Sequence, residues 1–307
     1  MWSFVFCLLI AGAAAAPWWL ESRRQKIDKA ARKNAAGKFV SLGRGVTHYQ
    51  WSGPVRGPVA VLIHGLSTPS VVWDEVGEGV GTLGYRVLTY DLYGRGLSDA
   101  PRGPQDASFF VDQLTELLDD QGIEEEITLV GYSMGGAIAT AFAARNTHRM
   151  KQLVLLASAG VATKESGFSE YCRTNPIIGD WLFGTFGARR MLGGLKTSTP
   201  RNPKILAAQK NELQRQGFLR SVLASRRGIL ADMLEQEHRE ISRADVPVFA
   251  IWAADDHVIP IGSIGRLVEW NRTVRQEQVD GAGHDIPYTH SAEVVSILRG
   301  LFLERYE

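Results

Sequence analysis

Short apolar runs bounded by turn residues recur along the chain and predict buried strands. Runs of this length without polar alternation are typical of strands that are covered on both faces of a sheet. Five such runs occupy residues 59–63, 87–90, 127–130, 153–156 and 248–252.

Further segments complete an alternation of strands and helices. Residues 39–42 and 46–51 flank the turn Gly43-Arg44-Gly45 and predict a hairpin, and residues 275–279 form one more strand-like segment. Strands that alternate with helices predict a mostly parallel sheet with helices on both faces. Apolar residues at helical spacing, or richness in Ala, mark residues 109–118, 134–145 and 294–303 as the helices.

One long segment, residues 161–244, interrupts this alternation. It contains no strand-like run and much helix-forming sequence broken by Gly and Pro, and it is too long for a plain loop. We expect it to form a helical cap over the strand ends. The core of an α/β fold is then expected from residues 38–160 and 245–307.

The N-terminus carries an apolar segment long enough to cross a membrane. Residues 2–20 have no charged side chain, and as a helix they would span roughly 28 Å, close to the hydrocarbon thickness of a bilayer. Trp18 and Trp19 close the segment, and basic residues dominate the following residues 21–37. We expect residues 1–20 to be a single-pass membrane anchor, followed by a basic linker and a domain on the cytoplasmic side.

The same segment allows a second interpretation, a signal peptide cleaved near Ala14-Ala15-Ala16. Small residues at this position suit cleavage, although the basic residues that normally begin a signal peptide are missing. Under this alternative the mature protein would be secreted or periplasmic.

Composition adds few constraints. The chain has 307 residues, 45% hydrophobic and 22% charged, which is ordinary for a globular protein. A net charge of +1 gives no bulk attraction to nucleic acid, so no nucleic-acid partner is expected. The chain has two cysteines, Cys7 and Cys172, so we expect no disulfide framework. No cluster of residues has metal-ligand spacing. We expect no metal ion and no organic cofactor, and the oligomeric state is left open.

Candidate chemistry begins at Gly131-Tyr132-Ser133-Met134-Gly135, between an apolar run and the Ala-rich helix. In this strand–turn–helix context, the G-x-S-x-G pattern predicts a serine on a strained turn with small neighbours. Amides at the start of the following helix favour developing negative charge. We therefore predict that Ser133 is a catalytic nucleophile.

A serine nucleophile needs a base and an acid that orients the base. His284 lies in a glycine-containing turn after the last strand-like segment, where it would sit beside Ser133 at the carboxyl edge of the sheet. We predict that His284 is the general base. Asp255 and Asp256 follow the preceding strand and suit the chain order Ser, acid, His. Asp256 is the preferred acid because a helix-opening proline follows four residues later, and Asp255 remains the alternative.

Backbone amides are expected to bind the oxyanion. His64-Gly65-Leu66 follows a strand-like run, where the chain must turn and present N–H groups. We predict that the amides of Leu66 and Met134 form the oxyanion hole and that the His64 side chain supports the loop. The loop of residues 91–99 follows another strand and is interpreted as a structural, hydrogen-bonded turn.

These motifs together resemble the α/β-hydrolase family over roughly residues 38–305. The resemblance implies an eight-stranded, mostly parallel sheet flanked by helices, and a Ser-His-Asp triad that needs no cofactor. The residues that carry it are the His64-Gly65 loop, residues 91–99, the elbow at residues 131–135, Asp256 with Pro260, and Gly283-His284.

The identity of the nucleophile narrows the resemblance. An Asp nucleophile would point to haloalkane dehalogenases or epoxide hydrolases, and Ser133 argues against both. The Ser-Met-Gly-Gly run is similar to that of membrane-anchored monoacylglycerol lipases, and equally to that of carbon–carbon bond hydrolases acting on ring-cleavage products. The apolar N-terminal segment favours the lipid-facing group.

The expected function is therefore hydrolysis of carboxylic esters of a monoacylglycerol-like or lysolipid-like substrate through an acyl-enzyme. Carbon–carbon bond hydrolysis is the alternative enzymatic hypothesis, and a non-catalytic binding protein is a third. Apolar residues of the cap would line an acyl tunnel or form the core of the cap itself. They are Phe168, Ile177, Ile178, Leu182, Phe183, Phe186, Leu219 and Leu223.

Overall fold

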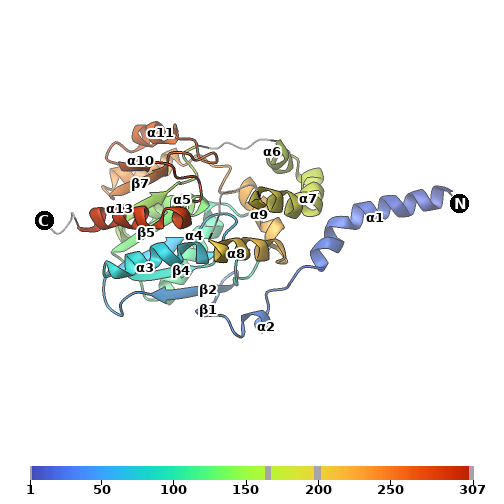
Figure 1. The fold of residues 1–307 in the computed structure, drawn as a ribbon, viewed down its shortest axis with the longest axis horizontal. Coiled ribbons are helices and arrows are strands. Elements are labelled where there is room, and N and C mark those ends of the chain that lie inside the picture. Colours follow the sequence, from blue (N-terminus) through green and yellow to red (C-terminus); the bar gives the residue numbers. More distant parts are fainter. Residues whose placement is uncertain (1, 163–166, 197–201, 304–307) are drawn as a thin grey trace.

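A single eight-stranded sheet forms the centre of the molecule (Figure 1). The computed structural model describes residues 2–162, 167–196 and 202–303. Met1, residues 163–166 and 197–201 of the predicted cap, and residues 304–307 of the predicted core lie outside the described part. The strands are β1 (Lys38–Leu42), β2 (Gly45–Ser52), β3 (Val59–Ile63), β4 (Arg86–Tyr90), β5 (Ile127–Tyr132), β6 (Met150–Leu156), β7 (Val248–Ala253) and β8 (Arg275–Val279).

The order of the strands places β5 near the middle of the sheet. The order is β1-β2-β4-β3-β5-β6-β7-β8, with β1 and β2 antiparallel to each other and β3 to β8 parallel. The inner strands are buried because both of their faces carry Val, Leu and Ile side chains. The predicted fold, a mostly parallel eight-stranded sheet flanked by helices, is confirmed.

Two layers of helices cover the faces of this sheet. One face packs against α4 (Ala107–Asp120), α5 (Met134–Arg145), α10 (Glu235–Arg243) and α11 (Ser263–Trp270). The other face packs against α3 (Asp74–Thr82) and α13 (Ser291–Leu303). Short elements complete the core: η1 (Ser70–Trp73), η2 (Thr147–Arg149) and α12 (Ile286–Thr289).

Helices fill the long connection between β6 and β7. Helices α6 (Gly167–Thr174), α7 (Pro176–Lys196), α8 (Pro203–Leu213) and α9 (Phe218–Arg227) share a small apolar core that includes Phe183, and we call these four helices the cap. In Figure 1 the cap lies at one end of the sheet. Helix α10 belongs to the same predicted segment, yet it packs against α5 in the helical layer that contains α4, α5 and α11.

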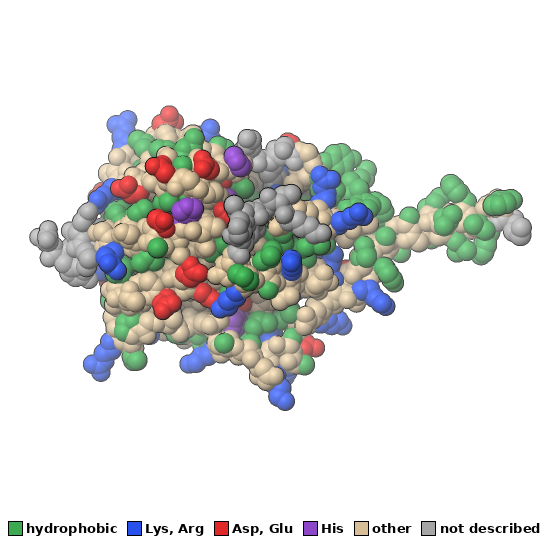
Figure 2. All heavy atoms as spheres, in the orientation of Figure 1, with side chains coloured by type: hydrophobic (Ala, Val, Ile, Leu, Met, Phe, Trp, Pro, Cys, Tyr) green, Lys and Arg blue, Asp and Glu red, His purple; other side chains and the backbone are tan. Residues whose placement is uncertain are grey.

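The apolar N-terminal segment forms helix α1 (Trp2–Ser22), which projects from the molecule beyond the cap (Figures 1 and 2). Among the described residues, α1 is the one helix whose length and apolar composition would allow it to cross a membrane. Its second half packs on α7, where Trp181 Nε1 donates a hydrogen bond of 2.9 Å to the carbonyl of Ala13. The N-terminal segment therefore contacts the cap.

The segment after α1 is also attached to the cap. The N–H of Gln25 donates to the carbonyl of Gln214 at 2.8 Å, and the N–H of Gln216 donates to the carbonyl of Gln25 at 2.8 Å. These bonds join the chain to the turn between α8 and α9. A short helix, α2 (Lys29–Arg32), then leads to β1.

A buried histidine lies in the helical layer formed by α4, α5, α10 and α11. His238 in α10 is fully buried and stacks on Trp270, and neither ring nitrogen has a hydrogen-bond partner among the described residues. Burial lowers the pKa of His238 from 6.5 to about 4, because no charged group compensates for the loss of water. The ring is therefore neutral in the folded protein near pH 7.

We expect His238→Phe to make the protein less sensitive to acid. Below pH 6.5 the unfolded imidazole binds a proton that the folded protein refuses until about pH 4, so folding free energy is lost across this window. Phe keeps the stack on Trp270 and removes the proton linkage. Unfolding in urea at pH 7 and pH 4.5 should show a smaller loss in the variant, by about 2 kcal/mol.

The exposed His148, replaced by Phe in the same way, provides the control and should leave the pH dependence of the wild type unchanged. Equal losses of stability in wild type and His238→Phe would show that His238 accepts a proton in the folded state.

Candidate active site

Ser133 lies on the sharp turn between β5 and α5. Its backbone has φ 53° and ψ −120°, a strained conformation for a residue with a side chain. A Cβ atom added at Gly135 would lie 2.0 Å from the carbonyl oxygen of Ile63, and one at Gly131 would lie 2.4 Å from the carbonyl oxygen of Gly135. Only glycine fits at these two positions, which explains the sequence around Ser133.

His284 connects Ser133 to an aspartate. Its Nε2 atom lies 3.0 Å from Ser133 Oγ, and its Nδ1 atom lies 2.7 Å from Asp256 Oδ2. Since a carboxylate only accepts hydrogen bonds, Nδ1 carries the proton and Nε2 is free to accept from the serine hydroxyl. The structure thus brings together the three side chains that the sequence singled out from distant parts of the chain.

The two neighbouring aspartates differ clearly in their surroundings. The side chain of Asp256 is 3% exposed, and its second oxygen accepts hydrogen bonds from the N–H groups of Val258 and Ile259 at 2.7 and 2.8 Å. Asp255 is exposed, and its N–H donates to the carbonyl of Ala282. Only Asp256 contacts the histidine ring, and three N–H donors fix its carboxylate.

Tyr132, the residue before the serine, supports the histidine. Its hydroxyl donates a 2.7 Å hydrogen bond to the carbonyl of His284, and the two rings lie 5.3 Å apart. Sequence reasoning did not single out Tyr132, because the second position of G-x-S-x-G accepts many residues. The tyrosine fixes the backbone that carries the imidazole.

Leu66 and Met134 lie on the two chain segments that flank Ser133. Met134 is buried and begins α5, so its N–H lies at the N-terminus of that helix. Leu66 lies in the loop after β3, and a Cβ at Gly65 would lie 3.2 Å from the Cβ of Ser133. Glycine at position 65 therefore allows this loop to approach the serine closely.

His64 holds the same loop from the side of the core. Its Nε2 accepts a 2.9 Å hydrogen bond from the N–H of Leu92, and its Nδ1 lies 2.8 Å from the carbonyl oxygen of Gly65. This pattern assigns the proton to Nδ1. Burial lowers the pKa of His64 from 6.5 to about 4, so the ring is neutral at pH 7.

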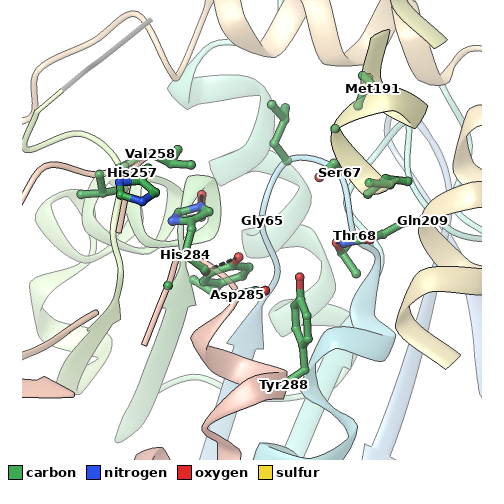
Figure 3. A pocket seen from close by; sticks show the side chains of 18 of the residues that line it. Gly65, Ser67, Thr68, Met191, Gln209, His257, Val258, His284, Asp285 and Tyr288 are labelled. Carbon is green, nitrogen blue, oxygen red and sulfur yellow. Dashed lines mark hydrogen bonds between the residues drawn. The ribbon is translucent and has the colours of Figure 1, made fainter. Parts of the chain in front are cut away.

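A cavity of about 1190 Å³ opens above Ser133, between the core and the cap. Figure 3 shows His284 between His257 and Val258 on one side, and Thr68 with Gln209 and Met191 on the other. Gln209 Nε2 donates a 2.8 Å hydrogen bond to Thr68 Oγ1, which joins the cap to the core at the edge of the cavity.

The cap contributes both apolar and polar residues to the cavity wall. The apolar ones are Met191, Leu195, Leu213 and Phe218, and the polar ones are Ser169, Gln209 and Arg226. The eight apolar cap residues considered from sequence do not line the cavity. Phe183, Leu219 and Leu223 are buried in the core of the cap, whereas Ile177, Ile178 and Phe186 are exposed. Cap residues neighbouring those considered from sequence therefore form the wall.

The loop of residues 91–99 has the buried hydrogen bonding expected of a structural turn. Asp91 accepts bonds from the N–H groups of Ser70 and Leu97, both at 2.9 Å, and from His48 Nδ1 at 2.7 Å. Burial alone would raise the pKa of Asp91, but these donors and the charge of His48 outweigh it and lower the pKa. The carboxylate is therefore charged and fixed.

No group of three or more His, Cys, Asp or Glu side chains suited to a metal ion occurs in residues 2–162, 167–196 and 202–303. Both cysteines have free thiols, with Cys7 exposed and Cys172 buried. The chemistry that the site offers lies in its hydroxyl, imidazole, carboxylate and backbone amides.

The sheet, the serine elbow and the cap define a serine hydrolase of the α/β-hydrolase class. The chain belongs to the family described as serine aminopeptidase, S33, whose model matches residues 54–288. A thermophilic esterase from Thermogutta terrifontis has the same fold, with a TM-score of 0.71 at 19% identity over 88% of this chain and 99% of that one.

Several curated relatives each cover more than two thirds of the chain. The pimeloyl-[acyl-carrier protein] methyl ester esterase of Aliivibrio fischeri is 27% identical over 82% of this chain and 96% of that protein. The 2-hydroxymuconate semialdehyde hydrolase of Pseudomonas sp. is 27% identical over 71% of this chain and 77% of that protein. A third match, an uncharacterised protein of Mycobacterium tuberculosis, is 33% identical over 105 residues, which span 30% of its length.

Proposed function

We propose that the protein hydrolyses carboxylic esters through an acyl-enzyme formed on Ser133. The observation that carries this proposal is the continuous line of hydrogen bonds from Ser133 Oγ through His284 to Asp256, at 3.0 and 2.7 Å. An imidazole whose Nε2 faces a hydroxyl is arranged to remove the hydroxyl proton as the oxygen attacks a carbonyl.

In this proposal each residue has one role in the reaction. His284 takes the proton of Ser133, then gives it to the leaving alcohol, and later activates the water that releases the acid. Asp256 holds the ring in one tautomer and stabilises its cationic form. The amides of Leu66 and Met134 bind the negative oxygen of the tetrahedral intermediates.

We propose further that the acyl group is long and apolar, as in a monoacylglycerol or lysolipid. The cap side of the cavity supports this, since Met191, Leu195, Leu213 and Phe218 present apolar side chains toward it. Burial of a methylene group there contributes about 0.8 kcal/mol, so each added carbon of the chain strengthens binding.

A second candidate function is hydrolysis of a carbon–carbon bond in a ring-cleavage product. Similarity to the 2-hydroxymuconate semialdehyde hydrolase over 226 residues favours it, at an identity equal to that of the methyl ester esterase. The same serine, base and oxyanion hole would serve this chemistry, so substrate preference separates the two candidates.

We propose that α1 is retained as a membrane anchor with the catalytic domain in the cytoplasm. Large apolar side chains of α1, from Trp2 to Trp19, are exposed. Near its end, Pro17 lies against Gly184 of the cap, and Trp181 donates a hydrogen bond to the carbonyl of Ala13. Signal cleavage after Ala16 would remove the helix turn that Trp181 contacts.

Replacement of the three aligned side chains tests the mechanism. Ser133→Ala should abolish labelling by a fluorophosphonate, and it should lower kcat for a p-nitrophenyl ester by about 10³-fold or more because no nucleophile remains. Asp256→Asn should lower kcat by about 10²- to 10⁴-fold because the wrong imidazole tautomer is favoured.

Asp255→Asn is the matched control, an identical change one residue away on an exposed side chain, and it should retain kcat within about threefold. Full labelling of Ser133→Ala by the fluorophosphonate would contradict the proposed nucleophile. A larger effect at Asp255 than at Asp256 would reverse the assignment of the acid.

A panel of substrates tests the acyl chain and the second candidate. We expect kcat/KM for p-nitrophenyl esters to rise with acyl length from acetate to at least octanoate, because longer chains reach the apolar side chains that the cap contributes to the cavity. Met191→Asn should reduce kcat/KM for the octanoate but not for the acetate. Met233→Asn, an exposed methionine outside the cavity, is the control.

Fastest hydrolysis of the acetate would remove the lipid-like substrate and leave ester hydrolysis in place. Turnover of a 2-hydroxymuconate semialdehyde without turnover of any ester would establish the second candidate.

The anchor is tested by fractionation of cells that express the full chain. We expect the protein to keep residues 1–16, by intact mass, and to stay in the membrane pellet after a carbonate wash. Leu9→Arg with Ile10→Arg, in the middle of α1, should release it because two charges oppose insertion. A mature protein that begins near Pro17 and is soluble would establish a cleaved signal peptide.

A further inference from the structure

Two buried side chains form hydrogen bonds with the loop that carries the Leu66 amide. His64 Nδ1 lies 2.8 Å from the carbonyl oxygen of Gly65, and Arg95 Nε donates a 3.0 Å hydrogen bond to the carbonyl oxygen of Leu66. The carbonyl of Gly65 and the N–H of Leu66 belong to one planar peptide group. His64 and Arg95 therefore fix the peptide groups on both sides of the Leu66 Cα atom.

Arg95 is fully buried and uses all five of its N–H groups. None of its hydrogen-bond acceptors is charged, so the guanidinium is not there to complete a short ion pair. Burying a cation among neutral acceptors costs free energy of desolvation. The contacts that Arg95 makes therefore indicate its role. The acceptors are the carbonyls of Leu66, Tyr93 and Ser221, the Gln105 side-chain oxygen and Ser225 Oγ.

These acceptors join two parts of the molecule. Ser221 and Ser225 lie in α9 of the cap, at 3.5 and 2.8 Å from Arg95, while Leu66 lies in the loop beside Ser133. One rigid guanidinium plane therefore links α9 to the peptide that follows the Leu66 amide.

Other bonds seat the cap on the same loop of residues 91–99. Glu212 of α8 accepts a 3.1 Å bond from the N–H of Gly96, and Arg215, in the turn between α8 and α9, donates to the carbonyl of Ser98. A shift of α8 or α9 would therefore move the loop that holds Arg95.

We propose that Arg95 is a positioning residue that couples the seating of the cap to the orientation of the Leu66 N–H, so that the oxyanion hole is complete only when α9 is docked. This rests on the proposed function, in which Leu66 binds the oxyanion. Arg95 lies outside the residues that line the cavity and acts through Leu66.

Kinetics of Arg95→Lys tests the proposal, with the short-chain ester as substrate. Lysine keeps the charge but cannot bind the Leu66 carbonyl and α9 in one plane. We expect kcat to fall about 10- to 100-fold, less than full loss of an oxyanion donor, with KM changed less than about threefold. The rate of labelling by the fluorophosphonate should fall by the same factor, because its phosphoryl oxygen occupies the oxyanion position.

Ser225→Ala is a milder second variant that removes one bond from Arg95 to the cap, together with the bond that Ser225 Oγ donates to Gln105 Oε1. It should lower kcat about three- to tenfold with KM unchanged, since one hydrogen bond to the charged guanidinium is lost. Because this substitution changes only one small side chain, it tests the proposal even if Arg95→Lys fails to fold.

Arg149→Lys is the matched control. Arg149 is also buried and binds the carbonyls of Ile123 and Glu124, but at the amino end of β5, opposite Ser133. It should lose stability in urea as Arg95→Lys does and keep the kcat of the wild type. Wild-type kcat in Ser225→Ala and Arg95→Lys, or an equal fall in Arg149→Lys, would overturn the proposal. Ser133→Ala tests the proposed function separately, because it leaves these bonds intact.

Discussion

The close approach of the Ser133 turn to the end of β3 is the constraint on which the site depends. A Cβ at Gly135 would lie 2.0 Å from the carbonyl oxygen of Ile63, so α5 can start against β3 only with glycine there. This approach fixes the direction of α5 and strains Ser133, whose φ is 53°. The strain aims the hydroxyl out of the sheet toward the cavity, and the buried packing of β5 and α5 holds it.

Hydrogen bonds to backbone groups set the positions of the other polar side chains of the site. Two N–H groups hold Asp256, the hydroxyl of Tyr132 holds the backbone of His284, and the neutral ring of His64 bridges two loops. Groups held in this way need little reorganisation when charge develops on a substrate. Ser133 itself needs no such partner because its own backbone turn orients it.

The sequence predicts features that a local motif or pattern encodes, including each member of the proposed triad, and it misses contacts between distant segments that no motif marks. Apolar runs located the inner strands because β3 to β7 are buried on both faces, and G-x-S-x-G was informative because it encodes a backbone collision. Helix α3 escaped notice because its glycines at 77, 79 and 81 interrupt the helical pattern. Arg95 gave no signal, because an arginine between two glycines in a loop is usually exposed. Its burial depends on α9, more than a hundred residues away, which no local pattern encodes.

The loop of residues 91–99 is where the separate parts of the molecule meet. Strand β2 contacts it through His48, the cap through Glu212, and the linker after α1 through Arg32, which donates to the carbonyl of Leu97 at 2.9 Å. Arg95 extends from this loop to the peptide beside Ser133. Helix α1 also packs on α7 of the cap. The N-terminal segment is therefore connected to the site in two ways, through α7 and through the linker. The N-terminal segment is thus joined, through the linker, to the loop that supports the proposed oxyanion hole.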